Sequence, residues 1–271
     1  MKQHIQVTIP VSGQELREIL VAQLSYAGYE AFEETDAELK AFIEQQQFDE
    51  AALKALLQLH ELNFSSALLP ATNWNEEWER NFQPVIVEDF CAVRASFHAP
   101  VAGVQHEIII TPKMSFGTGH HATTYMMVQL MRTIDFSEKY VFDFGTGTGI
   151  LAILAEKLGA KMIVAMDNDE WSMLNAAENM TANHCSSVRL LHADNIPLTE
   201  SFDIILANIN KQVILDTLKQ MKEKLLPGGY IMLSGLLGSD EEAVREEASK
   251  NGLSFVQQQS RGGWIAFLLR L

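Results

Sequence analysis

Three glycines at alternate positions, Gly145, Gly147 and Gly149, follow a short apolar segment in which Asp143 is the only charged residue. Glycine adopts positive φ without strain and lets a ligand approach the backbone closely. The helical pattern that begins at Ile150 places a helix N-terminus beside the turn, where free N–H groups favour an anion. The third glycine comes one position earlier than in the dinucleotide fingerprint. This spacing indicates a nucleoside ligand without a pyrophosphate, for which S-adenosylmethionine is the obvious candidate; a purely structural turn is the alternative.

Further polar side chains follow apolar segments at points where strands should end. Asp167 comes roughly 20 residues after Gly145, the spacing of an acid that binds ribose hydroxyls from the end of the next strand. Asn208 follows another apolar segment, and its amide could hold a small polar group, although asparagine is also common in turns. Asp169 suits the N-cap of the following helix. Asp194, after a third strand, could contact an adenine ring or form a turn.

A glycine-rich loop with two adjacent histidines precedes another helical pattern. The loop covers residues 116–124, F-G-T-G-H-H-A-T-T. Thr123 or Thr124 is the expected N-cap of the helix, since hydroxyl side chains accept hydrogen bonds from its first free N–H groups. His121 is a candidate proton acceptor. No cysteine or further histidine stands at metal-ligand spacing from this pair, so we expect no metal site.

Helical and strand patterns alternate through the second part of the chain, which predicts an α/β fold with a doubly wound, Rossmann-like parallel sheet. In such sheets ligands bind outside the carboxyl ends of the strands, near the first strand–helix turn. Gly145, Asp167 and Asn208 all fall at such ends, so we expect them to lie together. This convergence supports a binding site more than any single motif does.

The first 70 residues carry a different pattern. Their periodicity changes in the order β-α-β-β-α-β, that of a ferredoxin-like α+β unit, and they contain no titratable cluster that suggests catalysis. We therefore predict a ferredoxin-like substrate-recognition domain over 1–70 and a second domain over 85–271. An aromatic stripe at helical spacing predicts a linker helix over 71–84, with a ligand cage as the alternative. The stripe consists of Trp74, Trp78 and Phe82.

Charge and cysteine content limit the partners of this 271-residue chain, whose formal net charge is −15. Lysine and arginine drive binding to nucleic acid, so this charge argues against direct nucleic-acid binding and suits a basic protein partner; solubility alone is the alternative. Cys91 and Cys185 belong to no C-x-x-C pair, which indicates a reducing compartment. The N-terminus reads as a strand, not a signal peptide, and no apolar run approaches the roughly 20 residues of a membrane helix. We expect a cytoplasmic monomer without a membrane segment.

Several motifs together resemble the ribosomal protein L11 methyltransferase family. The loop at 116–124 paired with Ala-Asn-Ile at 207–209 is restricted in distribution, whereas the glycine turn is shared by many methyltransferases. The further matching motifs lie at 143–152, 167–169 and 227–236. The leading domain and the aromatic linker also match, so the resemblance covers essentially the whole chain. It implies a class I methyltransferase that uses S-adenosylmethionine to methylate lysine side-chain or N-terminal amines of ribosomal protein L11.

The resemblance also implies which residues contact the cofactor. The family's contacts carry over to Thr124, Gly145, Asp167 and Asn208, and Asn208 is also the candidate catalytic residue. With the neighbouring turn and loop added, the expected cofactor-binding residues are Phe116, Gly117, Thr124, Gly145, Gly147, Asp167 and Asn208. Two positions depart from the family. Ala122 stands where proline is usual, which should loosen the loop, and Asn210 replaces a usual leucine, which places an extra amide near the acceptor.

The expected reaction is direct in-line methyl transfer to a neutral amine. A lysine amine has an ordinary pKa of about 10.4 and must first lose its proton; desolvation beside a positive sulfonium lowers that pKa. Asn208 or a backbone carbonyl could hold the amine in line, so orientation would supply most of the effect without a strong base. The alternatives are a methyltransferase for another protein, RNA or a small-molecule amine, a non-catalytic adaptor that binds S-adenosylmethionine, and a nicotinamide-dependent dehydrogenase.

Overall fold

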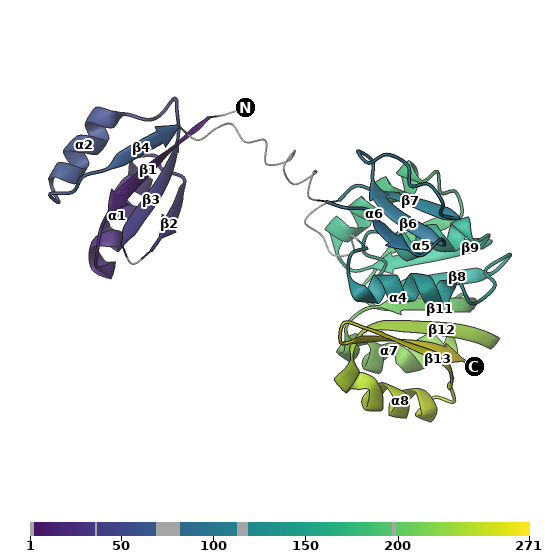
Figure 1. Ribbon diagram of the computed structural model, residues 1–271. Coiled ribbons are helices and arrows are strands. Elements are labelled where there is room, and N and C mark those ends of the chain that lie inside the picture. Colours follow the sequence, from purple (N-terminus) through teal and green to yellow (C-terminus); the bar gives the residue numbers. More distant parts are fainter. Residues whose placement is uncertain (1–2, 36, 69–81, 113–118, 197–198) are drawn as a thin grey trace. The chain divides into compact units, whose positions relative to one another are not determined.

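The chain forms two compact units, Met1–Phe82 and Gln83–Leu271. The computed structural model describes residues 3–35, 37–68, 82–112, 119–196 and 199–271 (Figure 1). The predicted linker helix over 71–84, with Trp74 and Trp78, lies almost entirely outside the described residues.

The N-terminal unit consists of β1 His4–Pro10, α1 Gln14–Tyr26, β2 Ala31–Glu34, β3 Glu38–Glu44, α2 Glu50–Gln58 and β4 Ser65–Leu68. Its strands form one antiparallel sheet in the order β2-β3-β1-β4, which is the ferredoxin-like arrangement. Alternate residues of β1 and β3, among them Val7, Ile9 and Leu39, form a core with leucines of both helices. The side chain of Asp49 accepts hydrogen bonds from two N–H groups of α2 and so caps it.

The C-terminal unit begins with three short strands, β5 Val85–Val87, β6 Cys91–Ala95 and β7 His106–Ile110. These strands form a sheet of their own in the order β5-β6-β7. β5 and β6 are antiparallel, whereas β6 and β7 are parallel. β7 therefore lies at an edge of this small sheet.

The remaining elements form the predicted doubly wound sheet. They are α4 Ala122–Met131, β8 Tyr140–Phe144, α5 Ile150–Lys157, β9 Met162–Asp167, α6 Glu170–Ala182, β10 Val188–His192, β11 Phe202–Asn208, α7 Lys211–Glu223, β12 Leu225–Leu237, α8 Glu241–Lys250, β13 Ser254–Arg261 and β14 Trp264–Arg270. The strand order is β10-β9-β8-β11-β12-β14-β13; the first five strands pair in parallel, and β14 pairs antiparallel with both β12 and β13. The chain winds outward from β8 and then restarts at β11, so the strand order reverses between β8 and β11.

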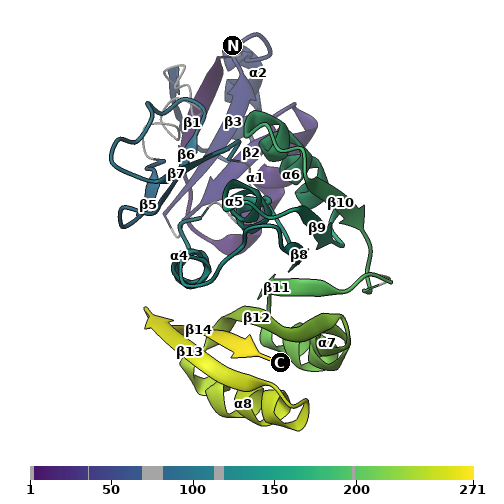
Figure 2. The same ribbon diagram turned by 90° about the vertical axis from the view of Figure 1, so that its right-hand side faces the viewer.

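Helices cover both faces of this sheet. Figure 2 shows α4 and α5 on one side and α7 and α8 on the other. The central strands are accordingly near-continuous apolar runs, because a strand buried on both faces has no solvent side. Val141, Phe142, Ile163, Val164 and Ile205 are all fully buried.

Glycines shape the antiparallel edge. Gly262 and Gly263 both have positive φ and join β13 to β14 by a two-residue hairpin turn. The segment Pro227-Gly228-Gly229 is part of β12. There the register shifts between the pairs Phe202–Leu225 and Ile204–Tyr230, which leaves the glycines as an irregularity within the strand.

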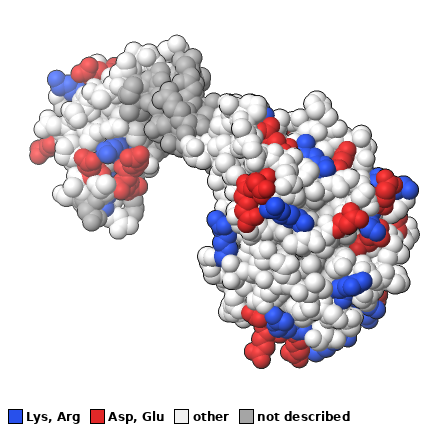
Figure 3. Space-filling model, turned by 45° about the vertical axis from the view of Figure 1, so that its right-hand side comes forward, with Lys and Arg blue, Asp and Glu red and all other residues white. Residues whose placement is uncertain are grey.

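Charged side chains are interspersed over the C-terminal unit. On the face that Figure 3 shows, acidic and basic groups of this unit alternate and form no continuous basic patch among the described residues. None of the described helices combines the length and apolar character that crossing a membrane requires.

Candidate cofactor-binding site

The three parallel strands at the centre of the sheet end at the same level. Phe144 of β8 pairs with Met166 of β9 and with Ala207 of β11. The residues that follow Phe144, Met166 and Ala207 in the chain are Gly145, Asp167 and Asn208, respectively. The structure brings together these three residues, which the sequence placed at strand ends, at the point where the strand order reverses.

The glycine turn has the backbone conformation that only glycine adopts readily. Gly145, Gly147 and Gly149 have φ of 76°, 55° and 83°. The N–H groups of Gly145 and Thr146 donate to the carbonyl of Met166 at 2.8 and 2.9 Å, which holds the turn against the end of β9. Gly149 precedes α5 without a side-chain cap, so the first N–H groups of the helix face the turn.

Asp167 is joined to the turn by its carboxylate. Its Oδ2 accepts a hydrogen bond from the N–H of Gly147 at 2.8 Å, and its Oδ1 accepts one from the N–H of Asp169 at 3.0 Å. Each carboxylate oxygen has two acceptor positions, so Asp167 keeps capacity for two hydroxyl donors. The half-buried carboxylate is thus oriented in advance of ligand binding.

Thr124 and Asn208 meet on the other side of the turn. The Nδ2 of Asn208 donates to the Oγ1 of Thr124 at 3.4 Å, across 84 positions of sequence. Ile209 follows Asn208 and lies directly against the turn, because a Cβ at Gly145 would overlap its Cγ2 atom. One continuous arrangement therefore links Thr124, Asn208, Gly145 and Asp167.

Asp143 is a buried acid beneath this arrangement, and the sequence analysis gave it no role of its own. Its side chain is 0% exposed, and burial raises its pKa from 3.8 to about 7. The Thr146 hydroxyl, which donates to its Oδ2 at 2.7 Å, opposes that rise, while the nearby Asp167 carboxylate adds to it. Its Oδ1 has no hydrogen-bond partner among the described residues.

The raised pKa of Asp143 predicts a pH-dependent stability. Between about pH 4 and 7 the folded chain keeps the proton that the unfolded chain releases, so this group lowers the free energy of unfolding as pH rises through that range. Asp143→Asn, which cannot ionise, should therefore gain stability relative to the unsubstituted protein between pH 5 and pH 8. Urea denaturation of both proteins without cofactor measures this difference. An equal difference at the two pH values would contradict the assignment.

His121, the candidate proton acceptor, is the N-cap of α4. Its Nδ1 accepts from the N–H of Thr123 at 3.4 Å and lies 2.7 Å from the Thr123 hydroxyl. Its ring packs edge-on against Trp264, with centroids 4.5 Å apart. The expected N-cap at Thr123 or Thr124 is wrong, since both lie within the first turn. Protonating Nδ1 would remove the cap, which argues against His121 as a base.

Other polar positions near the strand ends cap helices. Asp169 is the N-cap of α6, as expected, and accepts from the N–H and the hydroxyl of Ser172 at 2.8 Å. Asn210 is the N-cap of α7, where its Oδ1 accepts from the N–H of Val213 at 3.1 Å. The extra amide expected near the acceptor is therefore used within the protein. Asp194 is exposed in a bend after β10, and its two interpretations stay open.

Two expected cofactor contacts, Phe116 and Gly117, lie outside the described residues. The described histidines of the same loop join no group of three metal-ligating side chains. The one such group among the described residues is His4, Glu30 and Glu44 in the N-terminal unit, two of which are only partly buried or exposed. The absence of a metal at the loop stays a prediction.

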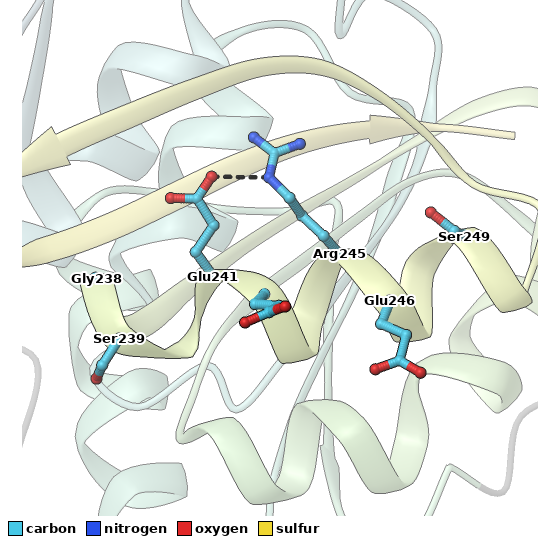
Figure 4. A pocket seen from close by; sticks show the side chains of 7 residues that line it. Gly238, Ser239, Glu241, Arg245, Glu246 and Ser249 are labelled. Carbon is cyan, nitrogen blue, oxygen red and sulfur yellow. Dashed lines mark hydrogen bonds and ion pairs between the residues drawn. The ribbon is translucent and has the colours of Figure 1, made fainter.

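A hollow on the surface of α8 contains none of these residues. It is lined by Gly238, Ser239, Glu241, Glu242, Arg245, Glu246 and Ser249 (Figure 4). Glu241 accepts from the Nε of Arg245 at 2.8 Å, so its one basic group is already paired. An acidic, open surface of this kind does not suit an anionic ligand, and the residues at the strand ends remain the candidate site.

The crevice fits S-adenosylmethionine. Asp167 can accept from ribose hydroxyls, and the uncapped N-terminus of α5 favours a carboxylate. The absence of a side chain at Gly145 lets Ile209 pack directly against the turn, which holds the Asn208–Ile209 segment beside the end of β8. When bound, this cofactor supplies an electrophilic methyl group on a positive sulfur.

Comparison with known proteins agrees with this site. The family model described as "Ribosomal protein L11 methyltransferase (PrmA)" matches residues 8–271. Proteins named ribosomal protein L11 methyltransferase are 37% identical in Bacteroides fragilis, over 93% of this chain and 92% of that protein, and 38% identical in Porphyromonas gingivalis, over 92% and 89%. The crystal structure of a ribosomal protein L11 methylase from Lactobacillus delbrueckii subsp. bulgaricus has a TM-score of 0.65 and 28% identity, over 69% of this chain and 98% of that one. The chain therefore belongs to the ribosomal protein L11 methyltransferase family, which consists of enzymes that use S-adenosylmethionine.

Proposed function

We propose that this enzyme methylates lysine side-chain or N-terminal amines of ribosomal protein L11, with S-adenosylmethionine as methyl donor. The observation that carries the proposal is that Asn208 is hydrogen-bonded to Thr124 while the next residue, Ile209, packs against the glycine turn at the strand ends. It is supported by a family match that spans almost the whole chain. The proposed substrate places the reaction in the cytoplasm, where ribosomes are assembled.

We assign the orientation of the acceptor amine to Asn208. An amide side chain offers both an acceptor and a donor, so its oxygen can accept from a neutral amine while its Nδ2 stays on Thr124. His121, the candidate proton acceptor, already caps α4, and the carboxyl group of Asp143 is fully buried. Proton loss to solvent and fixed orientation then account for the reaction without a dedicated base.

We assign recognition of L11 to the N-terminal unit. Its residues 1–82 include 14 Asp and Glu against 5 Lys and Arg, so more than half of the net charge lies in less than a third of the chain. A surface of this sign attracts a basic ribosomal protein and repels RNA. We further propose that the enzyme is a monomer that does not bind nucleic acid directly.

Methyl transfer from labelled S-adenosylmethionine tests this function. The enzyme is incubated with purified L11, with the other large-subunit proteins and with ribosomal RNA in separate reactions. We expect label on L11, and mass spectrometry of its peptides identifies the modified amines. Label on RNA or on a different protein alone would contradict the substrate, and the absence of label with every acceptor would contradict the proposed activity.

A further inference from the structure

Three asparagines line one face of α6 and its C-terminal end. Asn175, Asn179 and Asn183 are four residues apart, so they lie above one another along the helix. The first two are 0% exposed. A buried amide costs free energy unless its polar atoms are hydrogen-bonded, so their partners indicate what the asparagines hold in place.

Their shared partner is the chain at the end of β7. The N–H of Ile109 donates to Oδ1 of Asn183 at 2.9 Å, and the Nδ2 of Asn183 donates back to the Ile109 carbonyl at 2.6 Å. The N–H of Thr111 donates to Oδ1 of Asn179 at 2.7 Å, and the Thr111 carbonyl accepts from Nδ2 of Asn175 at 3.1 Å. The asparagine side chains thus provide hydrogen-bond partners for the backbone groups at the outer edge of β7, where a neighbouring strand would otherwise supply them.

Asn179 makes one additional contact, with the glycine turn. Its Nδ2 donates to the carbonyl of Thr148 at 2.8 Å, and Thr148 stands between Gly147 and Gly149. Asn183, by contrast, directs its Nδ2 to the carbonyls of Ile109 and Asn179. The side-chain amide of Asn179 therefore bridges the glycine turn and the segment that follows β7.

The packing around this amide is tight. A Cβ at Gly149 would lie 3.2 Å from Cε of Met180 and 3.5 Å from Cβ of Ala176, so α6 rests directly on the turn. Thr148 is 2% exposed. Water therefore cannot replace the hydrogen bond that Asn179 donates to the Thr148 carbonyl.

We propose that Asn179 is a positioning residue for the cofactor. By fixing the Thr148 carbonyl, it keeps the N–H of the preceding residue, Gly147, hydrogen-bonded to Asp167 and so sets the affinity for S-adenosylmethionine. The inference rests on the proposed function of the crevice. It assigns a role in cofactor binding to a residue that does not line the strand ends.

Asn179→Asp tests this role with almost no change in shape. The carboxylate still accepts from Thr111 but cannot donate to Thr148, so we expect the Kd and the KM for S-adenosylmethionine to rise about tenfold, while the KM for the protein acceptor changes less than about twofold. If the buried carboxylate of Asn179→Asp prevents folding, Asn179→Ala is measured in its place. Kd is measured by calorimetry below the melting transition of each variant.

Asn183→Ala is the matched control, because Asn183 holds the same edge of β7 from the same helix without touching the turn. We expect it to lower the melting temperature while its Kd for S-adenosylmethionine stays within about twofold of the unsubstituted protein. Equal losses of cofactor affinity in the Asn179 and Asn183 variants, or none in either, would overturn the proposal. Failure of the unsubstituted protein to bind S-adenosylmethionine would instead contradict the proposed function.

Discussion

Asp167→Ala should weaken binding of S-adenosylmethionine about 100-fold or more. A hydrogen bond to a charged acceptor contributes about 1.5–3 kcal/mol, and two ribose hydroxyls would lose that acceptor together. The substitution also removes the partner of the Gly147 N–H, which loosens the turn. Calorimetric titration of the folded variant measures the change in Kd.

The control for this variant is Asp169→Ala. Asp169 lies two residues away and carries the same charge, but its carboxylate caps α6 by accepting from Ser172. We expect a lower melting temperature and an unchanged Kd. If the Asp167 variant binds S-adenosylmethionine as tightly as the unsubstituted protein, Asp167 does not contact the ribose. An equal loss of affinity in the Asp169 variant would contradict the ribose contact as well.

Gly145→Ala should weaken the same binding about tenfold to 100-fold. A methyl group there meets Ile209, whose branched side chain has few ways to move, and alanine is strained at φ 76°. The turn or the Asn208–Ile209 segment must shift, and small displacements in such a site cost large factors. The measured quantities are the Kd for S-adenosylmethionine and the rate of methyl transfer.

Gly252→Ala separates backbone strain from the clash. Gly252 has φ of 73°, close to that of Gly145, but nothing lies within 4 Å of a Cβ built there. Backbone strain should cost each variant about 1–2 kcal/mol of stability, the clash should add to this cost in the Gly145 variant, and only the Gly145 variant should lose cofactor affinity. Comparable affinity in the two variants would show that the contact between Gly145 and Ile209 does not shape the site.

Local patterns in the sequence predict much of the fold and the crevice. Alternating apolar residues mark β1, continuous apolar runs mark β8 and β9, and both patterns follow from which faces are buried. The three glycines of the turn require positive φ, which is a property of single residues. Asp167 and Asn208 fall at strand ends, and parallel strands bring such ends to one edge.

The features that sequence reasoning missed depend on partners distant in the chain. The amides of Asn179 and Asn183 pair with residues about 70 positions earlier, and no local pattern specifies that edge of β7. Three asparagines at helical spacing on a buried face were the available signal. The N-cap of α4 was predicted at Thr123 or Thr124 and lies at His121, because the cap depends on the local backbone at the start of α4 and a histidine cap is less common than a threonine one.

A crystal structure of the enzyme with S-adenosylhomocysteine tests the central claim most directly. The bound product should lie at the carboxyl ends of β8, β9 and β11, with its ribose hydroxyls on Asp167 and its carboxylate at the N-terminus of α5. Electron density for the product at any other place, or a crevice left empty at saturating concentration, would contradict the account.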